Sequence, residues 1–356
     1  MDATTSRSTG AGGEQSADER EDQMNKKMFF GLLLLVGSYA QLLFPRRLFS
    51  DPAYFLHGYP IVPGTVLGTA AALFNLGIIV FSEGVCQRFG APSLWRLATR
   101  DMRASVRFAL AATAAGLVME FFAQWLGKLW IYPYWTPWLY WVALLPGFAF
   151  YWASIVESYL AAKAALDAVA KLQGKSNMHG FESLLYSVLG AVGAALLLVV
   201  AWLYGRWYVA HGGYVFAATV PQQYAPPFAY VLLAFLGAWF VVEWGLHRRR
   251  LPSLVTSLLQ GYWVPAVAVA GSSLLLSFIM ESQNAVNRYW VYTHLPGRHM
   301  TFFGVQLSIF AAWPLQYFGL LLLPSVFVPS LAHLFWRRHG ETSTTDRDGD
   351  VDADRW

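Results

Sequence analysis

Long apolar stretches alternate with short polar ones over most of the chain. Eight of the apolar stretches are long enough for an α-helix to cross a bilayer. They are residues 28–44, 61–82, 105–125, 138–160, 184–205, 228–246, 261–280 and 301–323. The pattern therefore predicts an all-α integral membrane protein, a helical bundle of about eight transmembrane helices.

Segments of different character border these stretches. Residues 1–27 and 337–356 are polar and lack an apolar run, the second being acidic, and we expect both to be disordered tails. Residues 324–336 are apolar but short, and they contain two prolines. This composition favours either an interfacial piece or a continuation of the last helix.

The distribution of Lys and Arg predicts the orientation. An even number of spans places both termini on one side of the membrane, and that side carries most of the Lys and Arg residues near the helix ends. Because cytoplasmic loops are enriched in these residues, we expect both termini to be cytoplasmic. The predicted location is a bacterial inner (plasma) membrane.

Composition supports a membrane protein and excludes several other classes. Hydrophobic residues make up 56% of the chain and charged residues 13%, well below the charged fraction of about 25% in soluble domains. The net charge of +4 is spread over short loops, which argues against a nucleic-acid partner. Cys86 is the single cysteine, so an intramolecular disulfide is excluded.

Two polar segments in different halves of the chain resemble each other. Met-Glu ends an apolar stretch at Glu120 and again at Glu281, and Trp-x-Tyr follows at residues 130–132 and 290–292. Glu83 and Glu243 are each followed by Pro-Ser-Leu, at residues 92–94 and 252–254, with the same offset in the chain. This constant offset predicts two parallel four-helix repeats, residues 28–183 and 184–336, related by an axis along the membrane normal. The alternative is that helix ends independently attract the same residue types.

The glutamates of these segments are the first candidates for chemistry, because a carboxyl in an apolar stretch is costly without a partner. On an α-helix Glu120 would share one face with Gln124 and Lys128, and Glu281 would share one with Asn284 and Arg288. Glu120 and Glu281 are candidate proton donors, and Gln124 and Asn284 are candidate substrate ligands. The alternative is a structural tie, in which each acid pairs with Lys128 or Arg288 and fastens an outer loop.

Aromatic residues and a third acid complete the candidate binding residues. Trp130, Tyr132, Trp290 and Tyr292 could stack on a substrate, or they could form an aromatic belt at the membrane surface. Glu157 has no acidic counterpart in the second repeat, so it is either a binding residue or half of an interfacial pair with Lys163. The spacing of the histidines and acids predicts no metal site, and no phosphate-binding or dinucleotide motif occurs, so we expect no cofactor.

One of the two segments resembles a known family. Glu281, residues 288–292 (Arg-Tyr-Trp-Val-Tyr), residues 303–307 (Phe-Gly-Val-Gln-Leu) and residues 312–314 (Ala-Trp-Pro) resemble a pattern in carotenoid hydratases and small lycopene cyclases. The likeness is confined to residues 281–314 and departs at Gln306, where that family has proline. It implies acid catalysis on a polyene, with Glu281 and, by the repeat, Glu120 as proton donors. Both segments also resemble uncharacterised bacterial polytopic membrane proteins.

These observations lead to three hypotheses about function. The first is a membrane-embedded enzyme or binding protein for a lipophilic, isoprenoid-like small molecule that enters from the lipid bilayer. The second is a secondary transporter, since parallel repeats suit alternating access around a polar site. The third is a structural or assembly protein in which the acids hold loops. The sequence leaves the oligomeric state open.

Overall fold

The computed structural model describes residues 17–40, 55–56, 59–60, 64–132, 141, 145–169, 181–212, 220–287, 289–297, 299–302 and 305–338. Most of them are helical. The helices are α1 (Ala17–Ala40), α2 (Gly64–Arg88), α3 (Leu94–Arg100), α4 (Met102–Met119), the π-helix η4 (Glu120–Leu126), α6 (Leu145–Val169), α7 (Glu182–His211), the short 3-10 helix η7 (Gln222–Tyr224), α8 (Phe228–Arg248), α9 (Leu254–Leu259), α10 (Val264–Asn287), α11 (Leu307–Phe327) and α12 (Pro329–Trp336).

Six of the described helices are long and apolar enough to cross a membrane: α2, α4 continued by η4, α7, α8, α10 and α11. The prediction of a helical, multi-pass membrane protein is therefore confirmed. The other two predicted spans, 28–44 and 138–160, overlap α1 and α6 in part, which are helices of 24 and 25 residues. These two helices are not among the six.

Three sequence-based boundaries need correction. The tail predicted for residues 1–27 is too long, because α1 begins at Ala17. The last span begins at Leu307 and not at residue 301, because residues 301–306 contain two short strands. Residues 324–336 do not form one piece: α11 continues to Phe327, and Pro329 then starts the separate helix α12. The predicted tail 337–356 lies outside the described residues from residue 339 onward.

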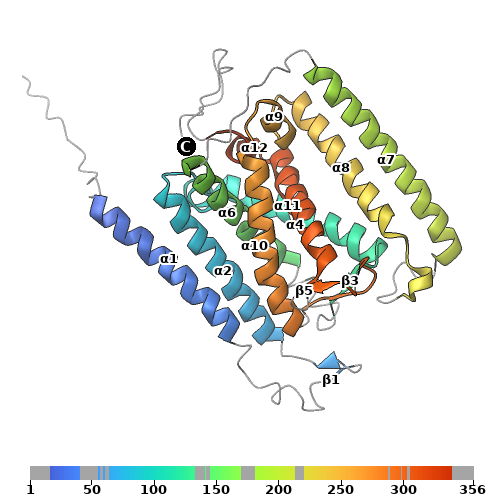
Figure 1. Ribbon diagram of the computed structural model, residues 1–356, viewed down its shortest axis with the longest axis horizontal. Helices are drawn as coiled ribbons and strands as arrows, with labels where there is room; N and C mark the ends of the chain where they lie inside the picture. The colour runs from blue at the N-terminus through green and yellow to red at the C-terminus, as the bar shows by residue number, and fades with distance from the viewer. Residues whose placement is uncertain are drawn as a thin grey trace, which may run out of the picture.

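The helices form a central group flanked by two pairs. In Figure 1, α4, α6, α10 and α11 lie in the middle, while α1 and α7 lie at opposite edges. Helix α1 packs against α2, and α7 packs against α8. In the centre, α6 contacts α2, α4 and α10, and α11 contacts α8, α10 and α4. Large side chains with almost no exposed surface, among them Trp152, Tyr159, Leu321 and Trp336, fill this central group.

Turns of the same construction end α2 and α8. Gly90 and Arg250 adopt left-handed backbone with φ of 63° and 58°, and a backbone hydrogen bond of 2.9 Å from the following residue closes each turn. Ser93 and Ser253 then accept a hydrogen bond from the first turn of α3 and α9. We call the end of the bundle that carries α9 and α12 the α9 end, and the opposite end, which carries β3 and β5, the β3 end (Figure 1).

Three antiparallel pairs of two-residue strands occur in the described chain. Two are local: β1 (Phe55–Leu56) with β2 (Tyr59–Pro60), and β5 (Thr301–Phe302) with β6 (Val305–Gln306). The third joins β3 (Trp130–Ile131) to β4 (Val291–Tyr292), which follow η4 and α10. This pair connects the two Trp-x-Tyr segments and positions the candidate site.

Candidate functional site

The two Trp-x-Tyr segments lie side by side at the β3 end. In the β3–β4 pair, Trp130 is opposite Tyr292 and Ile131 is opposite Val291. A backbone hydrogen bond of 2.9 Å from Thr293 N to Leu129 O continues the pairing. Segments from different halves of the chain are thus joined through their main chains, directly beside the two candidate glutamates.

Glu281 is buried and accepts hydrogen bonds from three different side chains. Its exposed fraction is 2%. Oε1 accepts from the Tyr292 hydroxyl at 2.6 Å and from the Trp313 indole N–H at 3.2 Å, and Oε2 accepts from Asn284 Nδ2 at 3.2 Å. Asn284 in turn accepts a hydrogen bond of 3.0 Å from the backbone N–H of Trp290. The predicted grouping of Glu281 with Asn284 is therefore present, whereas Arg288 lies outside the described residues.

Glu120 has an equivalent partner in its own segment. It is 1% exposed, and Tyr132 donates a hydrogen bond of 2.6 Å from its hydroxyl to Glu120 Oε1. Tyr132 and Tyr292 occupy the same position of the two Trp-x-Tyr segments, so each glutamate is bound by the tyrosine of its own segment. The two segments resemble each other in contacts as well as in sequence.

The expected α-helical stripe of Glu120, Gln124 and Lys128 is wrong in its geometry. The α-helix ends at Met119, and residues 120–126 form a π-helix, which has more residues per turn and rotates later side chains away from that stripe. Lys128 lies beyond this helix with left-handed backbone at φ 55°. Its side chain is 4% exposed, and burial lowers its pKa to about 8.

Tyr151 lies on α6, which packs against both α4 and α10, the helices that lead to the two glutamates. Its hydroxyl interacts electrostatically with both Glu281 and Glu120, and with Tyr292. We call Glu120, Glu281, Tyr132, Tyr151 and Tyr292 the carboxylate cluster. Burial, reinforced by the Glu281 carboxylate, raises the pKa of Tyr292 well above its usual value, so this hydroxyl keeps its proton and donates at neutral pH.

Polar atoms beside the carboxylate cluster have unused hydrogen-bonding capacity. Gln124 Oε1, Trp130 Nε1 and the Tyr317 hydroxyl are buried and have no hydrogen-bond partner among the described residues. The Tyr317 ring lies 5.6 Å, between ring centres, from Trp313, whose indole N–H donates to Glu281. Buried polar groups are almost always satisfied, so such atoms suggest bound water or a ligand.

The predicted aromatic residues lie at the cluster and pack against the core. Trp130, Trp290 and Tyr292 are partly buried and contact the main hydrophobic core. Trp290 and Tyr292 also participate in the hydrogen bonds around Glu281. A membrane-surface belt accounts for their residue type, but these contacts place them beside the candidate acids.

Glu157 has a different role from the cluster glutamates. It is 1% exposed and accepts a hydrogen bond of 2.5 Å from the backbone N–H of Trp95, in the first turn of α3. Such a carboxylate stabilises a helix N-terminus. Lys163, the partner in the alternative interpretation of Glu157, forms an ion pair with Asp167 at 3.6 Å. In the described structure Glu157 makes no hydrogen bond to the carboxylate cluster.

Sequence reasoning missed Tyr151, and it named Trp313 only as part of the family resemblance of residues 281–314. Tyr151 belongs to a run of aromatic residues inside a predicted span, so its spacing did not point to the glutamates. The aromatic run of residues 148–152 is the one signal in this part of α6. Polar contacts between distant helices depend on how those helices pack, which local patterns do not encode.

Comparisons with known proteins identify no relative. No family model matches the chain, and no curated protein or solved structure is significantly similar to it. The likeness of residues 281–314 to carotenoid-modifying proteins stays a prediction. The functional argument below therefore rests on the carboxylate cluster.

Proposed function

We propose that this multi-pass membrane protein takes a lipophilic, isoprenoid-like small molecule from the bilayer and acts on it at the carboxylate cluster. The observation that carries the proposal is the β3–β4 pair, which joins the segments of the two acids, with each acid accepting a 2.6 Å hydrogen bond from the tyrosine of its own segment. Two buried acids held in adjoining segments can act on one ligand. The unsatisfied atoms of Gln124, Trp130 and Tyr317 add support, since they leave polar positions for a ligand.

The chemistry we propose is proton transfer to a carbon–carbon double bond. A carboxyl group within contact distance of a double bond can act as a general acid and convert the bond into a carbocation. Water then adds to the cation and loses a proton, or a neighbouring C–H loses its proton, and in either case that proton returns to the carboxylate. Glu281 accepts hydrogen bonds from three donors, and in its ionised form it would stabilise that positive charge. The rings of Trp290 and Trp313 offer cation–π stabilisation in addition. Glu120 is then the first candidate for the acid that donates the proton to the double bond.

We also propose that the site arose at the interface of two parallel four-helix repeats. The β3–β4 register supports this, because Ile131 and Val291, which occupy equivalent positions of the two repeats, are directly opposite each other. The same offset along the chain separates two further equivalent features. These are the turns at Gly90 and Arg250 and the helix caps at Ser93 and Ser253. In this proposal α1 and α6 are the first and fourth spans of eight, and the α9 end is cytoplasmic.

A structural role is the second candidate, and a specific observation favours it. The β3–β4 pair and the hydroxyls of Tyr132 and Tyr292 tie the two glutamates to the ends of α4 and α10. Such ties would hold the two halves together whether or not a ligand binds. In this case replacing the acids would lower the stability of the protein, and no catalytic activity would be affected.

The experiment compares membranes that contain the wild-type chain, Glu120→Gln, Glu281→Gln or the control Glu243→Gln. Glu243 is also fully buried, but it lies on α8 and accepts a hydrogen bond from Trp239. Membranes are incubated with the linear polyene lycopene. The products are separated by chromatography, and their molecular masses are measured. We expect the wild type and the control to form product, either a hydrate of higher mass or an isomer of unchanged mass. We expect Glu120→Gln and Glu281→Gln to form neither.

Other outcomes point to the other classes. Unchanged polyene with every folded chain contradicts the enzymatic proposal. If proton-coupled uptake into vesicles depends on Glu120 or Glu281, a transporter replaces the enzyme. If neither acid matters for conversion or uptake but both matter for thermal stability, the structural role is correct.

A further inference from the structure

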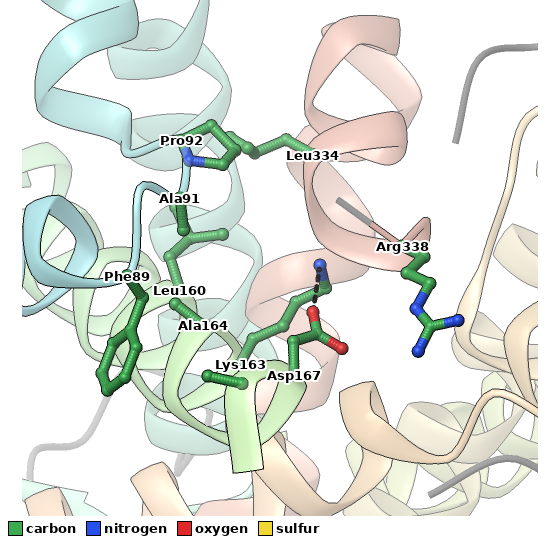
Figure 2. A pocket seen from close by; sticks show the side chains of 10 residues that line it. Phe89, Ala91, Pro92, Leu160, Lys163, Ala164, Asp167, Leu334 and Arg338 are labelled. Atoms are coloured by element: carbon green, nitrogen blue, oxygen red, sulfur yellow. Dashed lines mark ion pairs between the residues drawn. The ribbon is translucent and has the colours of Figure 1, made fainter. Parts of the chain in front are cut away.

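A second site lies at the α9 end, in a part of the molecule that the proposed function does not use. A pocket of about 220 Å³ opens between the turn after α2, the second half of α6 and the end of α12. Figure 2 shows Lys163 and Asp167 extending from α6, with Arg338 approaching from the end of α12. The remaining lining is mainly apolar, with Phe89, Leu160 and Leu334 as its larger side chains.

The lining carries an excess of positive charge. Lys163 and Arg338 contribute two positive charges and Asp167 contributes one negative charge. Asp167 is already engaged, because it pairs with Lys163 at 3.6 Å and accepts hydrogen bonds of 2.9 and 2.8 Å from the Tyr262 hydroxyl. The Lys163 ammonium lies 5.7 Å from the centre of the Tyr262 ring. These contacts hold the buried ammonium in place at the wall of the pocket.

The size and polarity of the pocket define the chemical class of its ligand. Its volume is below the roughly 300–1,000 Å³ of typical drug-sized ligand sites, so it suits one small group and not a whole lipid. A guanidinium and an ammonium that line one pocket bind phosphate well, the guanidinium through two parallel hydrogen bonds. Basic pockets between helices at the cytoplasmic membrane surface bind phospholipid head groups.

We infer that this pocket binds a phosphate group through Lys163 and Arg338, with Phe89, Leu160 and Leu334 contacting the adjoining part of the ligand. The phosphate can come from the head group of an anionic phospholipid or from a soluble phosphate compound. Both sources present the same charge and the same hydrogen-bond acceptors. The inference depends on the α9 end alone and is independent of the carboxylate cluster.

The test uses the purified full chain in detergent with two probes. Native mass spectrometry measures binding of phosphatidylglycerol against phosphatidylcholine, and thermal unfolding measures the effect of inorganic phosphate. The variant is Arg338→Gln. The matched control is Arg337→Gln, which removes the same charge from the neighbouring side chain, and Arg337 does not line the pocket. A second variant, Lys163→Met with Asp167→Asn, removes the ion pair without leaving a buried charge.

We expect wild type and Arg337→Gln to bind one of the two phosphate probes, and Arg338→Gln and the double variant to bind it about tenfold more weakly. Selective binding of phosphatidylglycerol over phosphatidylcholine identifies the lipid as the source, whereas stabilisation by inorganic phosphate alone identifies a soluble compound. The inference is overturned if neither probe binds the wild type, or if Arg337→Gln weakens binding as much as Arg338→Gln does.

Discussion

Ile131 and Val291 face each other across the β3–β4 pair, and they occupy the same position of the two Trp-x-Tyr segments. The pairing is antiparallel about these two residues, so Trp130, the first residue of one segment, is opposite Tyr292, the last residue of the other. An antiparallel pair in which each segment meets its own equivalent is the pattern of a two-fold interface. This register joins the two segments whose tyrosines, Tyr132 and Tyr292, donate hydrogen bonds to Glu120 and Glu281.

Tyr132→Phe and Tyr292→Phe are expected to destabilise the protein to a similar extent. Each change removes a 2.6 Å hydrogen bond to a buried carboxyl, and losing such a bond costs about 1 kcal/mol or more. The measurement is the midpoint of thermal unfolding in detergent. Tyr208→Phe, at an exposed residue of α7, is the control and should leave the midpoint unchanged. Equal midpoints for all three variants would mean that the tyrosine hydroxyls do not hold the glutamates.

Two glycines of α7 should respond in opposite directions to alanine. A Cβ at Gly193 would lie 2.8 Å from the Gly237 carbonyl oxygen of α8, whereas a Cβ at Gly205 would meet no atom of the described residues within 4 Å. Gly193→Ala must therefore separate α7 from α8 and lower the unfolding midpoint. Gly205→Ala should raise stability by up to about 1 kcal/mol through helix propensity. Stabilisation by both changes would contradict the close α7–α8 contact.

The buried Lys128 should make stability depend on alkaline pH. Burial lowers the pKa of Lys128 from 10.5 to about 8, so between these values the unfolded chain keeps a proton that the folded chain has lost. Stability then rises with pH across this window. Lys128→Met keeps the length of the side chain and removes the titration.

The measurement for Lys128 is the difference in unfolding midpoint between the wild type and Lys128→Met, recorded from neutral pH up to the usual pKa of lysine. Taking the difference cancels the groups that titrate in both chains. We expect the unfolding midpoint of the wild type to rise relative to that of Lys128→Met as pH rises through the lowered pKa of Lys128. A constant difference would show that Lys128 is solvated in the folded protein.

The positions of the helices were largely predictable from the sequence, and their ends were less so. Apolar runs located α2, α7, α8 and α10 because burial in lipid or core selects apolar side chains over the whole length of a span. The start of α1 was missed because its first turns are charged. The strands at 301–306 were missed because two-residue pairs have no periodicity to detect.

The candidate site was predictable in its residues but not in its geometry. The repeat of Glu, Trp and Tyr singled out Glu120, Glu281 and both tyrosines. The π-helix at 120–126 broke the expected stripe, since nothing in local propensity distinguishes it from an α-helix. The approach of Tyr151 to both acids depends on the packing of α6 between α4 and α10, which arises when distant segments meet.

Cross-linking of residues 131 and 291 tests the shared site most directly. Ile131→Cys and Val291→Cys are introduced together with Cys86→Ser, which removes the native thiol. Directly opposed residues of an antiparallel pair have Cα atoms about 4.5–5.5 Å apart, within the range that a disulfide bridges. Under mild oxidation in native membranes we predict a disulfide within one chain, absent from either single-cysteine variant. If both thiols react with a small maleimide but form no disulfide, the two segments do not meet, and a site shared by Glu120 and Glu281 is contradicted.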